Sequence, residues 1–385
     1  MLWMWLGCSP VPEDPVDPWA GLPFAPAGPA HSPDPGDWGP FPVGVTTMWM
    51  TDPDRSNDDG SPREVPVEVW YPAIDDGTPL RSYAVADLVP LERLEQDGID
   101  PDSLPILLSN SHDEAAADRD HGPYPLVVFS HGNGGMRLQS MFLTEYLASH
   151  GYVVASPDHV GNTLADMLMP DASGAFGTTA ESFAYRPGDV TRIVEALHGQ
   201  DDWIPVSDGP WGTVGHSLGA WTALRVAAEQ DGVGVAVAQA PPDIDLALVG
   251  TGTDPDELEV PVLLQAGTAD RILNYEENAW PSFEALSPPT LLATYFDAGH
   301  FTFSDLCILE LGPVQEMIYD SVGNVMEDGC GMDNPSPDVA LPLIRFHAVA
   351  MINGMLRDSP GSLVALETGT GESVHETLYT LHGEL

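Results

Sequence analysis

The pentapeptide Gly-His-Ser-Leu-Gly, from Gly215 to Gly219, follows a short apolar run and precedes the apolar-periodic segment AWTALRVAAE. A serine at a sharp strand-to-helix turn exposes its hydroxyl, and flanking glycines let the strand and the helix approach closely. Such a serine can attack the carbonyl carbon of an ester once a base removes its proton. The pattern predicts Ser217 as a nucleophile, although the motif alone also arises by chance in a glycine-rich chain.

A candidate acid and a candidate base follow this serine in the chain. The run VPVLLQAGTADRI predicts a buried strand with Asp270 just beyond its end, and LLATYFDAGHFTFSD predicts a strand followed by His300. The acid would hold the imidazole in the tautomer that accepts the serine proton. Taken singly, Asp270 could be a solvated turn residue and His300 a loop histidine. In the order serine, acid, histidine, the three predict a catalytic triad.

Acyl transfer also needs two backbone N–H groups directed at the oxyanion of the tetrahedral intermediate. One is predicted from Leu218, directly after the nucleophile. The other is predicted from Asn133, with Gly132 as the near alternative, in the turn that ends the apolar strand PLVVFSHGNGG. An ordinary glycine turn is the alternative interpretation of this loop.

The motif DHVGN carries another carboxylate and imidazole, Asp158 and His159. Both precede Ser217, whereas the partners of such a serine follow it in the chain. We therefore expect this loop to support the site through hydrogen bonds. Seven apolar or aromatic side chains near these turns are candidates for the pocket wall, although ordinary packing would also explain each one: Met136, Trp221, Met167, Met169, Phe176, Phe183 and Tyr185.

Alternating strands and helices must position these residues. The pattern predicts an α/β fold with a mostly parallel central sheet, helices on both faces and short insertions near the pocket. The predicted strands cover residues 43–50, 64–71, 126–130, 153–157, 211–215 and 233–239 and the runs before Asp270 and His300. The predicted helices cover residues 138–150, 187–197, 220–229, 277–285 and 341–356. Residues 81–122 predict one or two helices and a loop that border the pocket, and residues 361–385 are ambiguous.

Several segments resemble a known family: DPDRSNDDGSPREVPVEVWYPA, FSHGNGGMRLQSMFLTEYLASHGYVVASPDHVGNT, RPGDVTRIVEAL, GHSLGAW and GTADRI. They look like the bacterial "predicted dienelactone hydrolase" group, which is similar to the platelet-activating-factor acetylhydrolases and, more distantly, to cutinase-like polyester hydrolases. The resemblance extends from about Val43 to about Arg357. It implies the α/β-hydrolase fold and a serine esterase that needs no metal or other cofactor.

The resemblance also bears on the substrate. True dienelactone hydrolases use a cysteine nucleophile, whereas this chain carries Ser217, so a dienelactone is not the expected substrate. The acetylhydrolase resemblance favours a small or oxidised acyl group, and we expect a carboxylic-ester hydrolase that forms an acyl-enzyme. Two alternatives remain: a polyesterase or lipase acting on bulky or polymeric esters, and a non-catalytic surface lipoprotein with the same fold.

Composition limits the partners. The chain has 385 residues, 43% of them hydrophobic, and its motifs lie in one continuous series, so we expect one catalytic domain over residues 43–385. The formal net charge is −47, and all 12 basic residues are arginines. Such a surface repels nucleic acid and anionic membranes. The partner expected from the predicted triad and the family resemblance is a small-molecule or polymeric ester. The acidity fits either salt adaptation or a soluble secreted protein.

The amino terminus, MLWMWLGCSP, resembles the end of a bacterial lipoprotein signal in which Cys8 would be lipidated. Residues 1–42 would then comprise a signal remnant and a proline-rich tether, and membrane contact would be limited to this anchor. The absence of a basic segment before the apolar stretch is atypical of a signal peptide, and a disordered tail is the alternative. We expect an exported bacterial protein, either lipid-anchored in the envelope or secreted.

The two remaining cysteines, Cys307 and Cys330, flank a loop that begins shortly after His300. An even pair in an exported protein predicts a disulfide that closes this loop and braces the segment carrying the histidine. Two unpaired buried thiols are the alternative. The cysteine spacing has no metal-ligand pattern, so no metal site is expected.

Overall fold

The computed structural model describes residues 32–56, 60–169, 180–198, 203–368 and 378–384. The strands are β1 Val43–Ser56, β2 Pro62–Pro72, β3 Leu80–Ala84, β4 Ile106–Asp113, β5 Leu126–Ser130, β6 Val153–Pro157, β7 Trp211–His216, β8 Val233–Gln239, β9 Val262–Gly267, β10 Thr290–Tyr295 and β11 Tyr379–Glu384. The helices are α1 Leu91–Asp97, α2 Met141–Ser149, α3 Leu164–Met167, α4 Ala180–Leu197, α5 Leu218–Glu229, α6 Ile244–Leu248, α7 Ala279–Ala285, α8 Pro313–Val322, α9 Glu327–Cys330, α10 Pro337–Arg357 and α11 Pro360–Thr368. Cys8 lies outside the described residues.

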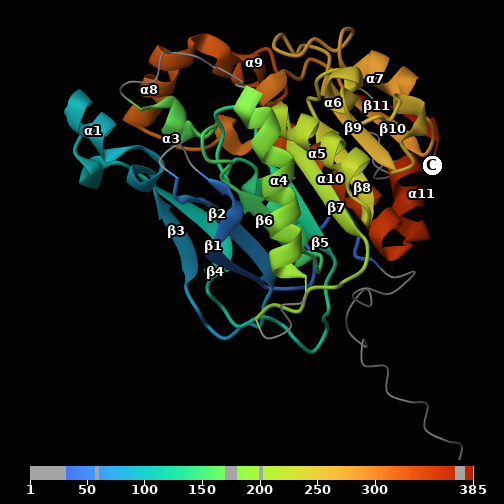
Figure 1. Cartoon of the computed structure of the whole chain (residues 1–385), viewed down its shortest axis with the longest axis horizontal. Coiled ribbons are helices and arrows are strands. Elements are labelled where there is room, and N and C mark those ends of the chain that lie inside the picture. The colour runs from blue at the N-terminus through green and yellow to red at the C-terminus, as the bar shows by residue number, and fades with distance from the viewer. Residues whose placement is uncertain (1–31, 57–59, 170–179, 199–202, 369–377, 385) are drawn as a thin grey trace, which may run out of the picture.

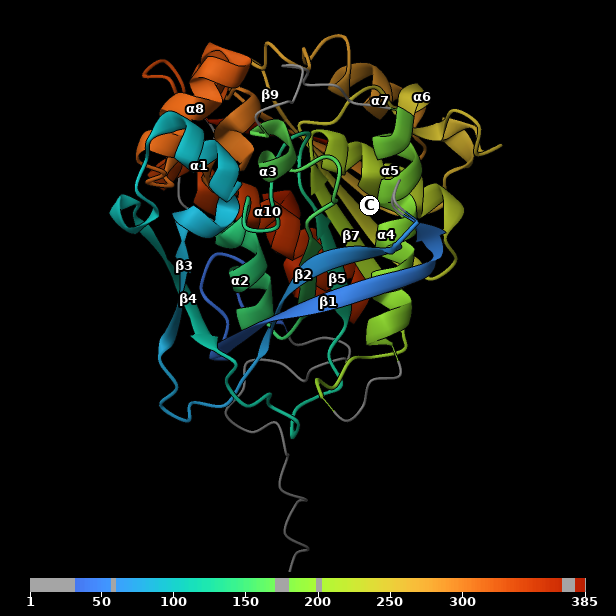
Figure 2. The same ribbon diagram turned by 60° about the vertical axis from the view of Figure 1, so that its left-hand side comes forward.

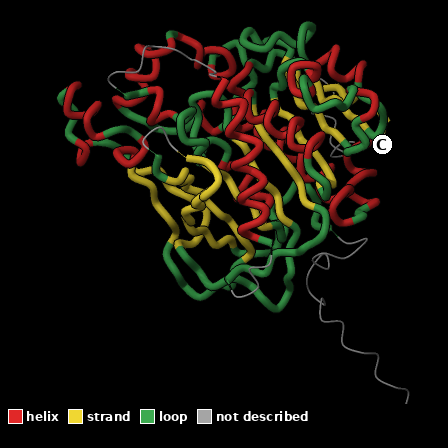
Figure 3. Tube along the Cα trace, in the orientation of Figure 1, coloured by secondary structure: helices red, strands yellow, loops and turns green. Residues whose placement is uncertain are grey.

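The strands form one sheet in the order β11-β10-β9-β8-β7-β5-β6-β2-β1-β4-β3. Six neighbouring strands, β6, β5, β7, β8, β9 and β10 in sheet order, are parallel. Strand β2 pairs with β6 and β11 pairs with β10 in antiparallel fashion. Figure 3 shows the strands as one twisted layer between helices. Central parallel strands are buried on both faces, which explains their continuous apolar sequences. The predicted α/β-hydrolase fold class is confirmed.

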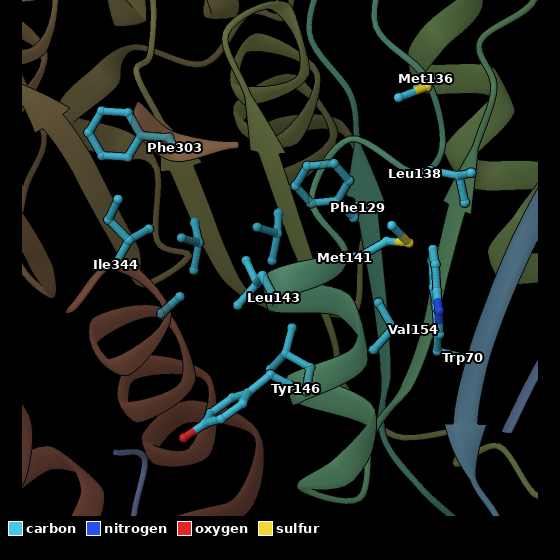
Figure 4. Packing of buried hydrophobic residues seen from close by; sticks show 14 of the residues in the cluster. Trp70, Phe129, Met136, Leu138, Met141, Leu143, Tyr146, Val154, Phe303 and Ile344 are labelled. Atoms are coloured by element: carbon cyan, nitrogen blue, oxygen red, sulfur yellow. The ribbon is translucent and has the colours of Figure 1, made fainter. Parts of the chain in front are cut away.

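Helices cover both faces of this sheet. In β5, Val127 and Phe129 pack with α2 and α10 on one face, whereas the alternate residue Val128 packs with α4 and α5 on the other. Figure 1 shows α4 in front of the sheet and α10 behind it. Figure 4 shows the α2 and α10 side of this core, where Leu143 and Ile344 face the strands. Helix α10 is long and apolar enough to cross a membrane, but 72% of its apolar window is buried within the protein.

The amino-terminal strand pair is as predicted, since β1 and β2 run antiparallel along their length, and Figure 2 shows them as two adjacent blue ribbons. The prediction for residues 81–122 is wrong in part, because this stretch contains strands β3 and β4 besides helix α1. In strand β4 an apolar side chain faces water and polar side chains face the interior. Leu108 is 80% exposed, while Ser109 and Ser111 are buried and hydrogen-bonded to Glu145. The usual alternation of apolar and polar residues therefore gave no strand signal.

Most arginine side chains are not free at the surface. Arg186 and Arg357 are buried, and Arg63 forms an ion pair with the buried Asp189. Of the twelve arginines, all of which lie in the described residues, Arg119 and Arg271 are the exposed ones. The other ten arginines are buried or half-buried, so few exposed positive charges remain to offset the acidic surface.

Candidate active site

The carboxyl ends of four parallel strands place the predicted catalytic residues at one edge of the sheet. Ser217 lies directly between β7 and α5 with φ of 57°, a left-handed conformation that is strained for a residue other than glycine. Its N–H donates to the carbonyl of Gln239 at 2.8 Å, which fixes the turn. A Cβ on Gly219 would lie 1.8 Å from the carbonyl oxygen of Ser130. The glycine therefore lets helix α5 touch the end of strand β5.

This contact predicts that Gly219→Ala lowers the free energy of unfolding by about 3 kcal/mol or more, because a methyl group there can fit only if the backbone moves. Urea unfolding followed by circular dichroism would measure the change. Gly361→Ala is the matched control, since a Cβ there meets nothing within 4 Å. Equal stability of the two variants would contradict the close approach of α5 and β5.

The structure brings Ser217, His300 and Asp270 together. His300 Nε2 lies 2.9 Å from Ser217 Oγ, and His300 Nδ1 lies 2.8 Å from Asp270 Oδ2. The other carboxylate oxygen of Asp270 accepts the N–H groups of Ile272 and Leu273 at 2.9 and 2.7 Å. Asp270 and His300 are each 3% exposed. With the acid oriented in this way, Nδ1–H donates to the carboxylate and Nε2 is free to accept the serine proton.

A second histidine, His216, supports His300 from behind. Its Nε2–H donates to the carbonyl oxygen of His300 at 2.9 Å, and its Nδ1 accepts the side-chain N–H of Gln139 at 2.8 Å. Burial lowers the pKa of His216 to about 3, so the ring is neutral near pH 7. The sequence analysis missed this role because the contact joins residues 84 positions apart.

The hydrogen bonds around the glycine-rich turn favour Asn133 over Gly132 as the second oxyanion donor. The N–H of Gly132 already donates to the side-chain oxygen of Gln139 at 3.0 Å. The N–H groups of Asn133 and Leu218 have no hydrogen-bond partner within the described part of the chain, and both residues line the cavity above Ser217. Two unpaired amides beside a nucleophile can bind a developing negative charge.

Behind this turn lies a buried row of polar side chains. His159 Nδ1 is 3.0 Å from Asp189 Oδ2, and its Nε2 is 3.1 Å from Ser130 Oγ. Burial lowers the pKa of His159 to about 4. Hydrogen bonds thus connect an aspartate, a histidine and a serine in the same order as in a catalytic triad, but Ser130 is fully buried and cannot contact a substrate. As the sequence analysis expects, the DHVGN loop supports the site: the N–H of His159 also donates to His131 Nε2.

Arg186 completes this support. Its guanidinium donates to the carbonyl oxygens of His131 and Gly132 at 2.6 and 3.0 Å and to the side chain of Asn162 at 2.5 Å. Burial lowers the pKa of Arg186 to about 9. Asn162 in turn donates to the side-chain oxygen of Asn133 at 2.6 Å. One buried cation therefore fixes two carbonyls of the glycine-rich turn and, through Asn162, the side chain of Asn133.

A cavity of about 360 Å³ opens above Ser217. Four predicted wall residues line it, namely Met136, Met167, Phe183 and Trp221. Met169 and Tyr185 are not among the lining residues, and Phe176 lies outside the described residues. Other apolar lining residues that the sequence analysis did not select are Leu164, Leu246, Leu273, Phe301, Leu306, Ile318, Val325 and Met326. No residue of 81–122 lines this cavity, so the predicted border by that stretch is wrong.

Part of this wall comes from a disulfide-closed segment. Cys307 and Cys330 form a disulfide, as the sequence predicts, and lie 23 positions apart in the sequence. Ile318, Val325 and Met326 reach the cavity from inside this loop. Within the described residues, no group of three or more His, Cys, Asp or Glu side chains is arranged to hold a metal ion.

Comparison with known proteins indicates a carboxylic ester hydrolase of the α/β-hydrolase fold. The family model of platelet-activating factor acetylhydrolase, isoform II, matches residues 39–174, and the model of the dienelactone hydrolase family matches residues 114–305. A solved ferulic acid esterase from Streptomyces cinnamoneus has the same fold, with a TM-score of 0.64, 22% identity and coverage of 89% of this chain and 96% of its own. No curated protein sequence matches significantly. The resemblance to the dienelactone hydrolase and acetylhydrolase groups is confirmed.

Proposed function

We propose that this carboxylic ester hydrolase of the α/β-hydrolase fold cleaves short-chain or small-acyl esters, with Ser217 as nucleophile, His300 as base and Asp270 as the orienting acid. One observation carries the proposal: an unbroken row of hydrogen bonds, 2.9 Å from serine to histidine and 2.8 Å from histidine to aspartate, at the floor of an apolar cavity. Intact geometry of this kind argues against a non-catalytic lipoprotein.

In the first half of the reaction, His300 Nε2 takes the proton of Ser217 Oγ as the oxygen attacks the ester carbonyl. The carbonyl oxygen gains negative charge and accepts the N–H groups of Leu218 and Asn133. Asp270 stabilises the imidazolium that forms. The tetrahedral intermediate then collapses, the proton passes from His300 to the alcohol, and the alcohol leaves.

In the second half, water enters the position that the alcohol has left. His300 accepts a proton from this water, which attacks the acyl carbon, and the bond to Ser217 Oγ breaks. The serine regains its proton from His300, and the carboxylic acid is released.

The size of the cavity supports a small substrate. Pockets that enclose drug-sized ligands measure roughly 300 to 1,000 Å³, and this cavity, at about 360 Å³, is near the lower end of that range. Its walls are mainly apolar, so they favour an aliphatic or aromatic group over a charged one. A long acyl chain would have to extend into water beyond the rim.

We therefore expect kcat/KM to be at least about tenfold higher for p-nitrophenyl acetate and butyrate than for the palmitate ester, because a chain that leaves the cavity gains no further burial. Initial rates below the aggregation concentration of each ester would measure this. A phospholipid with a short second chain and a polyester film complete the panel. Preference for palmitate or for the film would instead favour the lipase or polyesterase alternative.

One observation favours a second candidate, an aromatic acyl group. Phe183 and Trp221 meet edge to face on the cavity wall, with ring centroids 4.6 Å apart. Such a pair can stack an aromatic ring, and one solved protein with a similar fold is a ferulic acid esterase. Methyl ferulate belongs in the same panel, and a kcat/KM above that of the butyrate ester would favour this candidate.

We also propose that the protein is exported. A disulfide persists in an oxidising compartment, and Cys307 and Cys330 form one here. The sequence around Cys8 supports a lipid anchor. Mass measurement of the protein from its natural host would detect diacylglycerol on Cys8, whereas an unmodified chain in the medium would indicate secretion without an anchor.

A further inference from the structure

Asp328, a buried carboxylate outside the proposed triad, contacts the loops of both the acid and the base. One of its oxygens accepts the N–H of Arg271, the residue after Asp270, at 2.8 Å. The other accepts the N–H of His300 itself at 3.3 Å. The side chain is 4% exposed. A single carboxylate thus connects two loops that follow different strands, β9 and β10.

We propose that Asp328 is a positioning residue that holds Asp270 and His300 at the separation needed for proton transfer, an inference that rests on the proposed triad. Asp270 and His300 are 30 positions apart, and their side chains meet at 2.8 Å. A misplacement of about 1 Å can cost roughly a hundredfold in rate. Bonds to the backbone on both sides of that contact limit such a displacement.

The segment that carries Asp328 is itself fixed against the histidine loop. A Cβ on Gly329 would lie 2.4 Å from the N of Thr302, so the two backbones are in direct contact. Asn334 accepts the N–H of Gly329 at 3.2 Å and donates to the carbonyl of Asp297 at 2.7 Å. The disulfide joins Cys330, two residues after Asp328, to Cys307. Asp328 therefore has little freedom to move away from the two loops.

Burial makes Asp328 a specific partner rather than an incidental surface charge. A buried carboxylate is costly unless hydrogen bonds compensate for lost water, and here backbone N–H groups of the two loops supply them. The guanidinium Nε of Arg271 lies 3.7 Å away and adds a weaker attraction from an exposed side chain. Loss of the carboxylate would leave both N–H groups without an acceptor, and each loop could then relax separately.

The test compares Asp328→Ala and Asp328→Asn with Asp333→Ala, an exposed acid beyond the disulfide on the same segment. We expect Asp328→Ala to lower kcat for p-nitrophenyl butyrate by about tenfold or more, while KM changes less than about twofold, because the cavity walls stay in place. Asp328→Asn keeps one acceptor oxygen, so its kcat should lie between those of Asp328→Ala and wild type. Asp333→Ala should match wild type.

Thermal unfolding of each variant separates positioning from a purely structural role. A folded Asp328→Ala protein with wild-type kcat, or with a loss confined to KM, would overturn the inference. If Asp328→Ala does not fold, Asp328→Asn decides: a kcat reduced at least about threefold with unchanged KM supports positioning, and a wild-type kcat refutes it. Ser217→Ala keeps the two proposals apart, because turnover close to that of wild type in this variant would refute the triad irrespective of Asp328.

Discussion

Ser217→Ala should abolish hydrolysis of p-nitrophenyl butyrate and labelling by a fluorophosphonate, while the protein stays folded. The hydroxyl is the atom that would attack the ester, and its base already lies 2.9 Å away. Loss of a triad serine typically lowers kcat by about 10⁶-fold, so a fall of at least about 10⁴-fold is expected. The side chain makes no other hydrogen bond within the described residues, so removal of the oxygen should cost little stability.

Initial rates and the mass of the labelled protein would measure this result. Wild type should take up one fluorophosphonate per chain, and Ser217→Ala should take up none. Ser103→Ala is the control, since Ser103 is exposed in a turn outside the cavity and donates only to the carbonyl of Asp100. Unchanged turnover by Ser217→Ala would show that another group performs the attack.

The protein should lose stability steeply between about pH 6.5 and pH 4. Four buried histidines are responsible: burial lowers the pKa of His150 and His216 to about 3 and that of His159 to about 4, and it holds the pKa of His131 well below 6.5. Below pH 6.5 the unfolded chain binds protons at these positions and the folded chain does not. Stability that is present above pH 6.5 is therefore lost as the pH falls.

Protonation of Asp305 has the opposite effect on stability as the pH falls. Burial raises the pKa of Asp305 to about 7 from its ordinary value of 3.8, so the folded state takes up this proton before the unfolded state does as the pH falls. Its contribution to stability therefore grows between about pH 7 and pH 4. On unfolding, the four histidines bind about four protons and Asp305 releases one, so about three protons are taken up. The free energy of unfolding therefore falls by roughly 4 kcal/mol for each unit by which the pH is lowered. Unfolding near pH 5 is expected for a protein of ordinary stability.

Urea unfolding at pH 7.5, 6.5, 5.5 and 5 would measure this slope. His150→Gln tests the cause, because His150 does not line the cavity and Gln can still donate to the carbonyl of Asp37, which His150 Nε2 contacts at 2.8 Å. The variant should lose stability less steeply, by about 1.4 kcal/mol per pH unit. Equal slopes for wild type and His150→Gln would contradict a neutral, buried His150.

The parts of the site that follow from local sequence could be predicted. Ser217 lies in a turn whose glycines, preceding strand and following helix are contiguous, so a short window specifies it. Asp270 and His300 each follow an apolar strand, and parallel strands end at the same edge of a sheet. The predicted disulfide also needed only the count and spacing of cysteines.

The parts that depend on contacts across the chain could not be predicted. Asp328 is one acid among 59, and nothing near it in sequence indicates that it reaches the N–H groups of Arg271 and His300. The cavity walls from Ile318 and Met326 depend on how the disulfide-closed segment folds over the sheet. Strand β4 was missed because two of its three buried side chains, Ser109 and Ser111, are polar and its exposed Leu108 is apolar, which is the opposite of the pattern on which strand prediction relies.

The scarcity of exposed arginine has a consequence for proteolysis. Trypsin cleaves after lysine and arginine, and this chain has no lysine, so the folded protein offers trypsin mainly Arg119 and Arg271. The side chain of Arg271 is 67% exposed and directly follows Asp270. A first cut there would separate the acid from the backbone that orients it, so the enzyme would be inactivated by a single nick while most of its fold resisted digestion.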